Sequence, residues 1–196
     1  MKIGLFFGSF NPIHVGHLII AQTMVEDTDL DRVWFVVSPQ NPFKKSASLL
    51  AEYDRLHLVR LAIEGNDDLI ASDVEFALPR PSYTIDTLAH LRDKHPTQSF
   101  ALIMGTDNLR TIDKWKNADV LKRDHAIYVY RRGSHEQAPN QPSGAQVTMV
   151  DAPLLHISAT LIRERIRSGK SVRYMVPDTV ERYIEEMNLY RLGKTM

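Results

Sequence analysis

The sequence predicts an α/β fold: a doubly wound parallel sheet with helices on both faces and a small helical part at the C-terminal end. Short β-branched or aromatic runs alternate along the chain with longer stretches of helical period. The helical stretches between the runs have the length that crossover connections in a parallel sheet require. The chain of 196 residues can bury a sizeable core. We therefore expect a single domain over residues 1–196, with residues 157–196 as a C-terminal helical subregion.

Strands are expected, in chain order, at Lys2–Phe7, Arg32–Ser38, Leu69–Ser72, Ser99–Met104, His125–Tyr130 and Gln146–Val150. Helices are expected at Val15–Glu26, Leu50–Glu64, Thr84–His95, from Leu109–Ile112 on toward Lys122, Ala159–Ser168 and Pro177–Met187. This alternation is typical of a Rossmann-like sheet, in which ligands bind beyond the carboxyl ends of the strands. The segments after Phe7, Ser38, Met104 and Val150 are therefore the candidates for a site.

Composition excludes several classes of protein. The 24 Lys and Arg residues balance the 24 Asp and Glu residues, which argues against bulk attachment to nucleic acid or to an anionic membrane. The absence of cysteine excludes a disulfide framework, a cysteine nucleophile and a thiolate metal site. No segment approaches the roughly 18 apolar residues of a membrane span, and the apolar run at the N-terminus is too short for a signal peptide. We expect a cytoplasmic protein, and a homo-oligomer is compatible with the sequence.

A segment with two histidines, residues 8–17 (GSFNPIHVGH), follows the first expected strand. Gly8 ends the strand where a backbone without Cβ can turn sharply or lie close to a ligand. His14 and His17 are spaced so that their rings can share one face of the next helix, and Gly16 leaves room for a phosphate or a ring. The free N–H groups at a helix N-terminus favour an anion. The segment therefore predicts a phosphate site.

Other phosphate or metal motifs do not fit these residues. The glycine pattern of a dinucleotide-binding fingerprint is absent. Gly169, Lys170 and Ser171 have the order of the end of a Walker loop, but Glu164 stands where its first glycine should be. Two histidines without a third ligand are weak evidence for zinc, so no metal site is predicted.

A second candidate phosphate motif lies at residues 156–166 (HISATLIRERI). Ser158 is a good N-cap residue ahead of a helical pattern. The amides of Ala159 and Thr160, the Thr160 hydroxyl and the Arg163 guanidinium could converge on one phosphate group. On its own the segment also fits an ordinary capped helix with solvated arginines.

Other segments suit an acceptor molecule. In residues 80–88 (RPSYTIDTL), the amides around Thr84 would suit a small carboxylate if Thr84 opens a helix. Residues 104–109 (MGTDNL) place an acid after a strand-ending glycine, where it can bind a ribose, and Trp115 can stack on a flat cationic ring. Residues 37–45 (VSPQNPFKK) place two ammonium groups on a loop. Each segment also has a purely structural alternative: a helix cap for residues 80–88, core packing for Trp115 and a solvated loop for residues 37–45.

The two distant motifs resemble the H-x-G-H and I-S-x-T-x-x-R signatures of the nucleotidyltransferase superfamily. Its members transfer a nucleoside monophosphate from a nucleoside triphosphate to an acceptor and release pyrophosphate. The resemblance implies that His14, His17 and Arg163 are catalytic and stabilise negative charge on the transferring group. It implies an ATP site made by Gly8, Ser9, Phe10, His14, Gly16, His17, Gly105, Asp107, Ile157, Ser158, Thr160 and Arg163.

The S-Y-T-x-D-T-L run at residues 82–88 resembles the bacterial nicotinate mononucleotide adenylyltransferases within that superfamily. It separates them from phosphopantetheine adenylyltransferase and glycerol-phosphate cytidylyltransferase. This resemblance implies transfer of AMP from ATP to nicotinate mononucleotide, giving nicotinate adenine dinucleotide and pyrophosphate. Mg²⁺ would be carried by ATP and pyrophosphate, without dedicated protein ligands. The implied acceptor site comprises Asn11, Lys44, Lys45, Ser82, Tyr83, Thr84 and Trp115.

The chain departs from the family pattern at two positions. Phe43 stands where many members have histidine, and we expect Lys45 to compensate for the missing imidazole. Arg132 stands where proline is frequent. Two alternative functions remain open: a sibling transferase acting on nicotinamide mononucleotide, phosphopantetheine or riboflavin phosphate, and a nucleotide sensor that has lost turnover.

Overall fold

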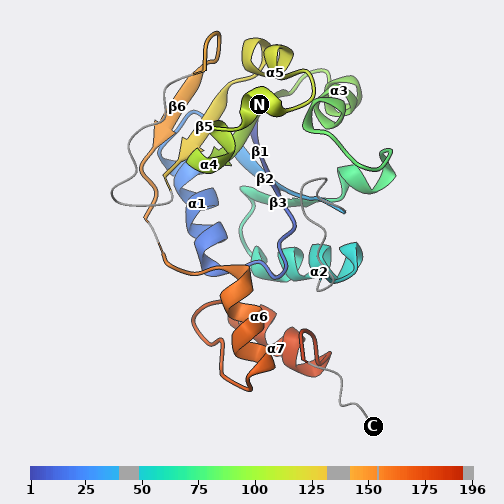
Figure 1. Cartoon of the computed structure of the whole chain (residues 1–196), viewed down its shortest axis with the longest axis vertical. Helices are drawn as coiled ribbons and strands as arrows, with labels where there is room; N and C mark the ends of the chain where they lie inside the picture. The colour runs from blue at the N-terminus through green and yellow to red at the C-terminus, as the bar shows by residue number, and fades with distance from the viewer. Residues whose placement is uncertain (40–48, 132–141, 154, 192–196) are drawn as a thin grey trace.

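A parallel sheet lies at the centre of the computed structural model, which describes residues 1–39, 49–131, 142–153 and 155–191 (Figure 1). Within these residues its strands are β1 (Lys2–Gly8), β2 (Arg32–Val37), β3 (Leu69–Ser72), β4 (Ser99–Gly105), β5 (Ile127–Tyr130) and β6 (Val147–Val150). They lie in the order β3-β2-β1-β4-β5-β6, and every neighbouring pair is parallel. The predicted strands and the doubly wound parallel sheet are thereby confirmed.

The helices cover both faces of the sheet, as predicted. They are α1 (Val15–Glu26), α2 (Glu52–Ala62), α3 (Thr84–Lys94), α4 (Thr106–Leu109), α5 (Ala118–Asp124), α6 (Ala159–Arg167) and α7 (Asp178–Glu186), with short 3-10 helices η1 (Val74–Ala77) and η2 (Ile112–Lys114). On one face, Met24 of α1 and Leu58 of α2 share a buried cluster with Phe35 of β2. On the other face, Leu88 of α3 and Leu121 of α5 pack in a second cluster.

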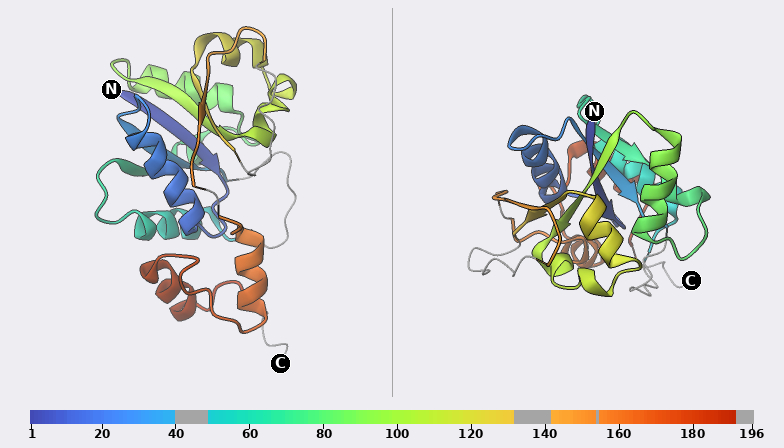
Figure 2. Two further views of the ribbon diagram at one scale, coloured as in Figure 1. Left: turned by 90° about the vertical axis from the view of Figure 1, so that its left-hand side faces the viewer. Right: turned by 90° about the horizontal axis from the view of Figure 1, so that it is seen from above.

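The two C-terminal helices lie beyond the sheet, on the side toward which the arrow of β1 points (Figure 2). Ile162 of α6 and Ile184 of α7 belong to the same buried cluster as Phe35 of the sheet. The Thr179 hydroxyl donates a hydrogen bond to the Leu61 carbonyl at 3.0 Å, which ties α7 to α2. The C-terminal helices are therefore packed on the core of the α/β unit.

The point where strand order reverses lies between β1 and β4. The chain builds β1, β2 and β3 outward in one direction and then returns through α3 to place β4 on the other side of β1. The two strands run side by side from Lys2↔Ser99 to Phe6↔Ile103. Their carboxyl ends, at Gly8 and Gly105, therefore open onto the crevice where such sheets bind ligands.

The prediction of one helix from Leu109 toward Lys122 is wrong. The chain forms α4, η2 and α5 there, and α4 starts earlier, at Thr106. Trp115 is extended at the end of η2, and Asn117 has left-handed backbone angles of φ 53° and ψ 43°. A left-handed residue cannot continue a right-handed helix, and asparagine adopts this conformation more readily than most residues. In the described part of the chain, no helix has the length and apolar character to cross a membrane.

Candidate active site

The turn between β1 and α1 brings the two histidines into direct contact. Their imidazole rings stack with centroids 3.7 Å apart and planes 26° from parallel. The backbone N–H of His14, the N-cap residue of α1, donates to Nδ1 of His17 at 3.3 Å. Because Nδ1 of His17 accepts this hydrogen bond, the hydrogen of the neutral ring resides on Nε2. The local backbone therefore selects the tautomer of His17 whose Nε2–H can donate to an anion.

The glycines of this turn make room for aromatic rings. Phe10 has a left-handed φ of 43° and is 2% exposed. A Cβ on Gly8 would lie 2.7 Å from the Phe10 ring, and a Cβ on Gly16 would lie 3.1 Å from Nδ1 of His14. The Phe10 ring then meets the His17 ring edge to face, with centroids 5.2 Å apart. A side chain at Gly8 would therefore collide with the Phe10 ring, and at Gly16 the ring of His14 would have to move by a few tenths of an ångström.

The second motif meets the first. Ser158 is the N-cap of α6, as predicted, and its hydroxyl accepts a hydrogen bond from the Leu161 amide at 3.1 Å. Arg163 donates to the Thr160 hydroxyl at 3.2 Å and to the Asn11 carbonyl at 2.7 Å. The last contact joins residues 152 apart in the sequence. It brings the guanidinium of one motif to the loop that precedes the histidines of the other.

The end of β4 lies beside this junction. Gly105 ends β4 and is the N-cap of α4, and Asp107 is exposed in the first turn of that helix. Ile157 is partly buried and packs against the same cluster as α6. Since β4 neighbours β1, the predicted ATP-side residues from both strands lie at one edge of the sheet.

The predicted nicotinate side is built on α3 and the segment after η2. Thr84 begins α3 as predicted, with Tyr83 as its N-cap residue. The Lys116 ammonium lies 2.8 Å from a carboxylate oxygen of Asp86 and 4.9 Å from the centroid of the Tyr83 ring. The neighbouring Trp115 is partly buried and packs against the core cluster under α3. Lys116 therefore ties the Tyr83 segment to the segment that carries Trp115.

Arg55 is a site component that the sequence analysis missed. Its side chain is fully buried in α2, and its Nε donates to the Leu50 carbonyl at 3.0 Å. Its Nη1 donates to the carbonyls of Ser9 at 2.7 Å and Ser38 at 2.8 Å, and its Nη2 to that of Pro39 at 3.1 Å. Burial lowers the pKa of this guanidinium. Arg55 thus joins the loops that follow β1 and β2 to the start of α2.

Glu75 in η1 was also missed. It is 2% exposed, and the Thr87 hydroxyl donates to its Oε1 at 2.9 Å. Its other carboxylate oxygen, Oε2, is buried without a hydrogen-bond partner. Burial raises the pKa of Glu75, and the hydrogen bond from the Thr87 hydroxyl opposes that shift. A buried acid of η1 is therefore bonded to α3 through Thr87.

Asn11 is held from three distant parts of the chain. Besides the contact of its carbonyl with Arg163, its side-chain Oδ1 accepts hydrogen bonds from the Leu50 amide at 3.3 Å and from the Tyr190 hydroxyl at 3.0 Å. Burial raises the pKa of the Tyr190 phenol well above its usual range, so Tyr190 is a donor here. The predicted acceptor residues Lys44 and Lys45 lie outside the described residues.

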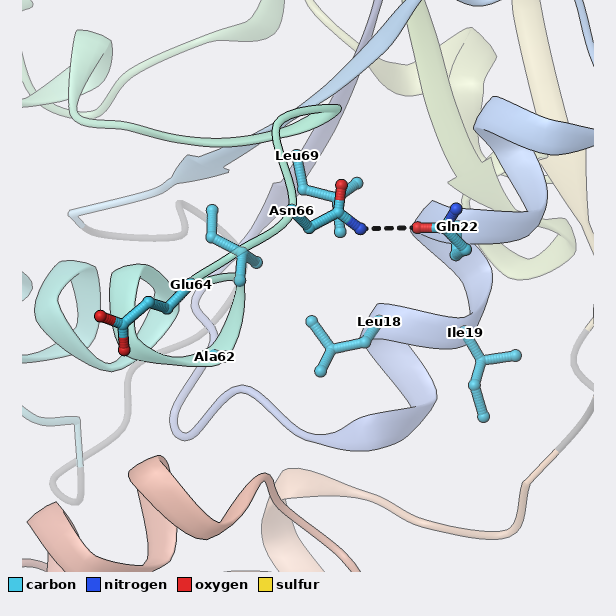
Figure 3. Close-up of a pocket in the computed structure, with 8 residues that line it drawn as sticks. Leu18, Ile19, Gln22, Ala62, Glu64, Asn66 and Leu69 are labelled. Carbon is cyan, nitrogen blue, oxygen red and sulfur yellow. Dashed lines mark hydrogen bonds between the residues drawn. The ribbon is translucent and has the colours of Figure 1, made fainter.

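A hollow of about 290 Å³ lies elsewhere, between α1 and the connection from α2 to β3 (Figure 3). A hydrogen bond of 2.8 Å from the Asn66 amide to the Gln22 side-chain oxygen spans it. Its lining residues are Leu18, Ile19, Gln22, Ala62, Ile63, Glu64, Asn66 and Leu69. None of them belongs to the predicted site, so the hollow is separate from the junction of the two motifs.

Known proteins resemble the chain over nearly its whole length. Residues 5–165 match the cytidylyltransferase-like family. A relative from Flavobacterium psychrophilum, named "Probable nicotinate-nucleotide adenylyltransferase", is 51% identical over 192 residues, which cover 97% of this chain and 100% of the relative. A relative of the same name from Cytophaga hutchinsonii is 54% identical over 190 residues, 97% of this chain and 98% of the relative.

A solved structure supports the fold. The Plasmodium falciparum nicotinic acid mononucleotide adenylyltransferase complexed with NaAD has a TM-score of 0.80 at 19% identity, over 96% of this chain and 97% of the other. At that identity the likeness concerns the fold alone, and it matches the sheet order and flanking helices described above. The family predicted from the two motifs is confirmed by the relatives: the chain belongs to the cytidylyltransferase-like family and, within it, to the nicotinate-nucleotide adenylyltransferases.

Proposed function

We propose that the protein transfers AMP from ATP to nicotinate mononucleotide, giving nicotinate adenine dinucleotide and pyrophosphate. The observation that carries this proposal is the contact of Arg163 with the Asn11 carbonyl at 2.7 Å. It joins the two phosphate motifs at the carboxyl ends of β1 and β4, where a triphosphate can be held from both sides. The names of the relatives support the choice of acceptor.

The reaction we propose needs positioning more than proton transfer. The 5′-phosphate of the acceptor attacks the α-phosphorus of ATP in line and expels pyrophosphate. A phosphate monoester is already nucleophilic near neutral pH, so no strong general base is required. The protein then contributes by aligning two polyanions and by stabilising charge on the transferring group. We assign that charge stabilisation to His14, His17 and Arg163, with Nε2–H of His17 as one donor.

The rest of the ATP site follows the same edge of the sheet. We assign to it Gly8, Ser9, Phe10, Gly16, Gly105, Asp107, Ile157, Ser158 and Thr160. Within the described ranges, no three His, Asp or Glu side chains gather in a way that could hold a metal ion. We therefore propose that Mg²⁺ accompanies the phosphates of ATP and pyrophosphate, where it would shield the leaving group.

The acceptor site we propose lies between the loop after β2 and the start of α3. Tyr83 and Thr84, at the N-terminus of α3, suit the carboxylate of the nicotinate ring, and Trp115 suits its face. We also assign the buried Ser82 and Asn11 to the acceptor site, and Lys44 and Lys45 would bind the 5′-phosphate. We further propose that residues 1–196 form one domain, because α6 and α7 share the core of the sheet, and that the reaction takes place in the cytoplasm.

The decisive experiment measures pyrophosphate release from ATP with nicotinate mononucleotide and nicotinamide mononucleotide in parallel. Phosphopantetheine and riboflavin phosphate serve as further acceptors. We expect the highest kcat/KM with the nicotinate form. Preference for another acceptor would identify a sibling transferase, and ATP binding without release from any acceptor would identify a nucleotide sensor.

A further inference from the structure

We propose that Arg55 is a positioning residue for the transfer reaction: it fixes the distance between the ATP side and the acceptor side of the site and so aligns the two substrates. This inference rests on the proposed function and deepens it. Arg55 lies near the start of α2, its side chain is fully buried, and none of the sequence motifs includes it. Its hydrogen bonds reach both sides of the site.

One nitrogen of Arg55 holds the loops that follow β1 and β2 where the two strands separate. The last paired residues of these strands are Gly8 and Val37, and the Ser38 amide donates to the Gly8 carbonyl at 2.9 Å. Just beyond, Nη1 of Arg55 donates to the Ser9 carbonyl at 2.7 Å and to the Ser38 carbonyl at 2.8 Å. Two carbonyl oxygens are both acceptors and cannot bond to each other. The shared nitrogen therefore links the ATP-side turn to the loop on the acceptor side.

The other two nitrogens of Arg55 hold the loop after β2 on either side of residues 40–48. Nη2 donates to the Pro39 carbonyl at 3.1 Å, and Nε donates to the Leu50 carbonyl at 3.0 Å. The Leu50 amide in turn donates to Oδ1 of Asn11 at 3.3 Å, in the turn before the histidines. The same guanidinium thus fixes the described ends of the acceptor-side loop and connects them back to the first phosphate motif.

Only arginine can make this set of bonds. A guanidinium presents five N–H groups in a planar fork, and four of those of Arg55 are directed at main-chain carbonyls. A lysine has one nitrogen and cannot reach the same four oxygens from one point. In-line transfer requires the reacting atoms to lie about 3–3.5 Å apart, and a misplacement of about 1 Å can lower the rate by about a hundredfold. A shift of one loop against the other therefore affects the chemical step.

The test is Arg55→Lys, which keeps the positive charge and loses the fork. We expect kcat to fall by between about tenfold and a hundredfold, because the two substrates are no longer aligned. The KM for ATP and the KM for nicotinate mononucleotide should each change less than about threefold, since no group that binds either substrate is removed. The kcat is expressed per ATP-binding site, counted by calorimetric titration with ATP, so that unfolded protein does not enter the comparison.

The control is Leu58→Ala, one helical turn further along α2. Leu58 is fully buried in the core, and its truncation destabilises the protein without touching either loop. Its kcat per ATP-binding site should stay within about twofold of the wild type. All proteins are assayed in sucrose, which favours the folded state. If Arg55→Lys still does not fold, Arg55→Gln replaces it, because a shorter amide also cannot span the four carbonyls.

Three results would overturn the proposal: a kcat per ATP-binding site that is unchanged in the Arg55 variant, an equal fall in Leu58→Ala, or KM values that rise tenfold while kcat stays the same. The wild type is measured first. Lack of turnover with every acceptor would refute the proposed function, and this inference with it. If the wild type prefers another acceptor, the proposed function fails alone, and the variants are compared with that acceptor.

Discussion

Among single residues, His17 has the tautomer that a charge-stabilising donor needs. The His14 amide fixes its tautomer, and the rings of His14 and Phe10 confine it. We expect His17→Ala to lower kcat by about 10²–10³ while the protein stays folded, since deletion of a transition-state donor has an effect of that order. Steady-state pyrophosphate release measures it. His57→Ala is the matched control, because His57 is exposed on α2 and should leave kcat unchanged. Near-normal turnover in His17→Ala would remove His17 from the chemistry.

Glu75 makes stability depend on pH in a defined direction. Burial raises the pKa of its carboxyl in the folded protein above the ordinary value. The folded state then binds the proton more tightly than the unfolded state, so the stabilising contribution is full at low pH and is lost as pH rises. We expect the unfolding free energy of the wild type, relative to Glu75→Gln, to be largest near about pH 4 and to decline toward about pH 7. Urea unfolding at several pH values measures it, and a difference that grows with pH would contradict it.

At the level of elements, Arg55 of α2 binds the loops that follow β1 and β2. Its guanidinium is fully buried and bonded to four main-chain carbonyls, those of Leu50, Ser9, Ser38 and Pro39. Arg55→Met leaves these buried acceptors without donors, and we expect a loss of about 3 kcal/mol of unfolding free energy. Arg60→Met, on the exposed side of the same helix, should stay within about 0.5 kcal/mol of the wild type. Urea denaturation compares them, and equal losses in the two variants would refute the role of Arg55.

The elements also show what the sequence can and cannot predict. The spacing of apolar residues, together with capping residues such as Ser158, predicts the strands and the helices α1, α3, α6 and α7. The helix expected from Leu109 fails because Trp115 is extended and Asn117 is left-handed, and the period of apolar residues reports neither conformation. Arg55 lies three and four residues before the buried Leu58 and Val59, on the same face of the helix, so its burial could be predicted from the sequence. Its partners were not, because they come from loops far away in the chain.

Across the whole molecule, Asn11 connects the C-terminal part of the chain to the first turn of the site. Arg163 binds its carbonyl from 152 residues away, and Tyr190 binds its side chain from 179 residues away. The meeting of the two signature motifs was predicted through the resemblance to a known superfamily. The role of Tyr190 was not, because a lone tyrosine near a chain end carries no local pattern that specifies a partner.

Tyr190 therefore offers a test of how the C-terminal segment stabilises the site. Its hydroxyl is buried and donates to Oδ1 of Asn11, which is 3% exposed. Tyr190→Phe keeps the ring packing but leaves that oxygen with one donor fewer, so we expect a loss of about 1 kcal/mol of unfolding free energy. Tyr174→Phe is the matched control, because Tyr174 is 79% exposed and its hydroxyl removal should change stability by less than about 0.5 kcal/mol. Urea unfolding of the two variants decides the matter: if they are equally stable, the bond between Tyr190 and Asn11 does not hold the C-terminal segment to the site, and Asn11 depends on Leu50 and Arg163 alone among these contacts.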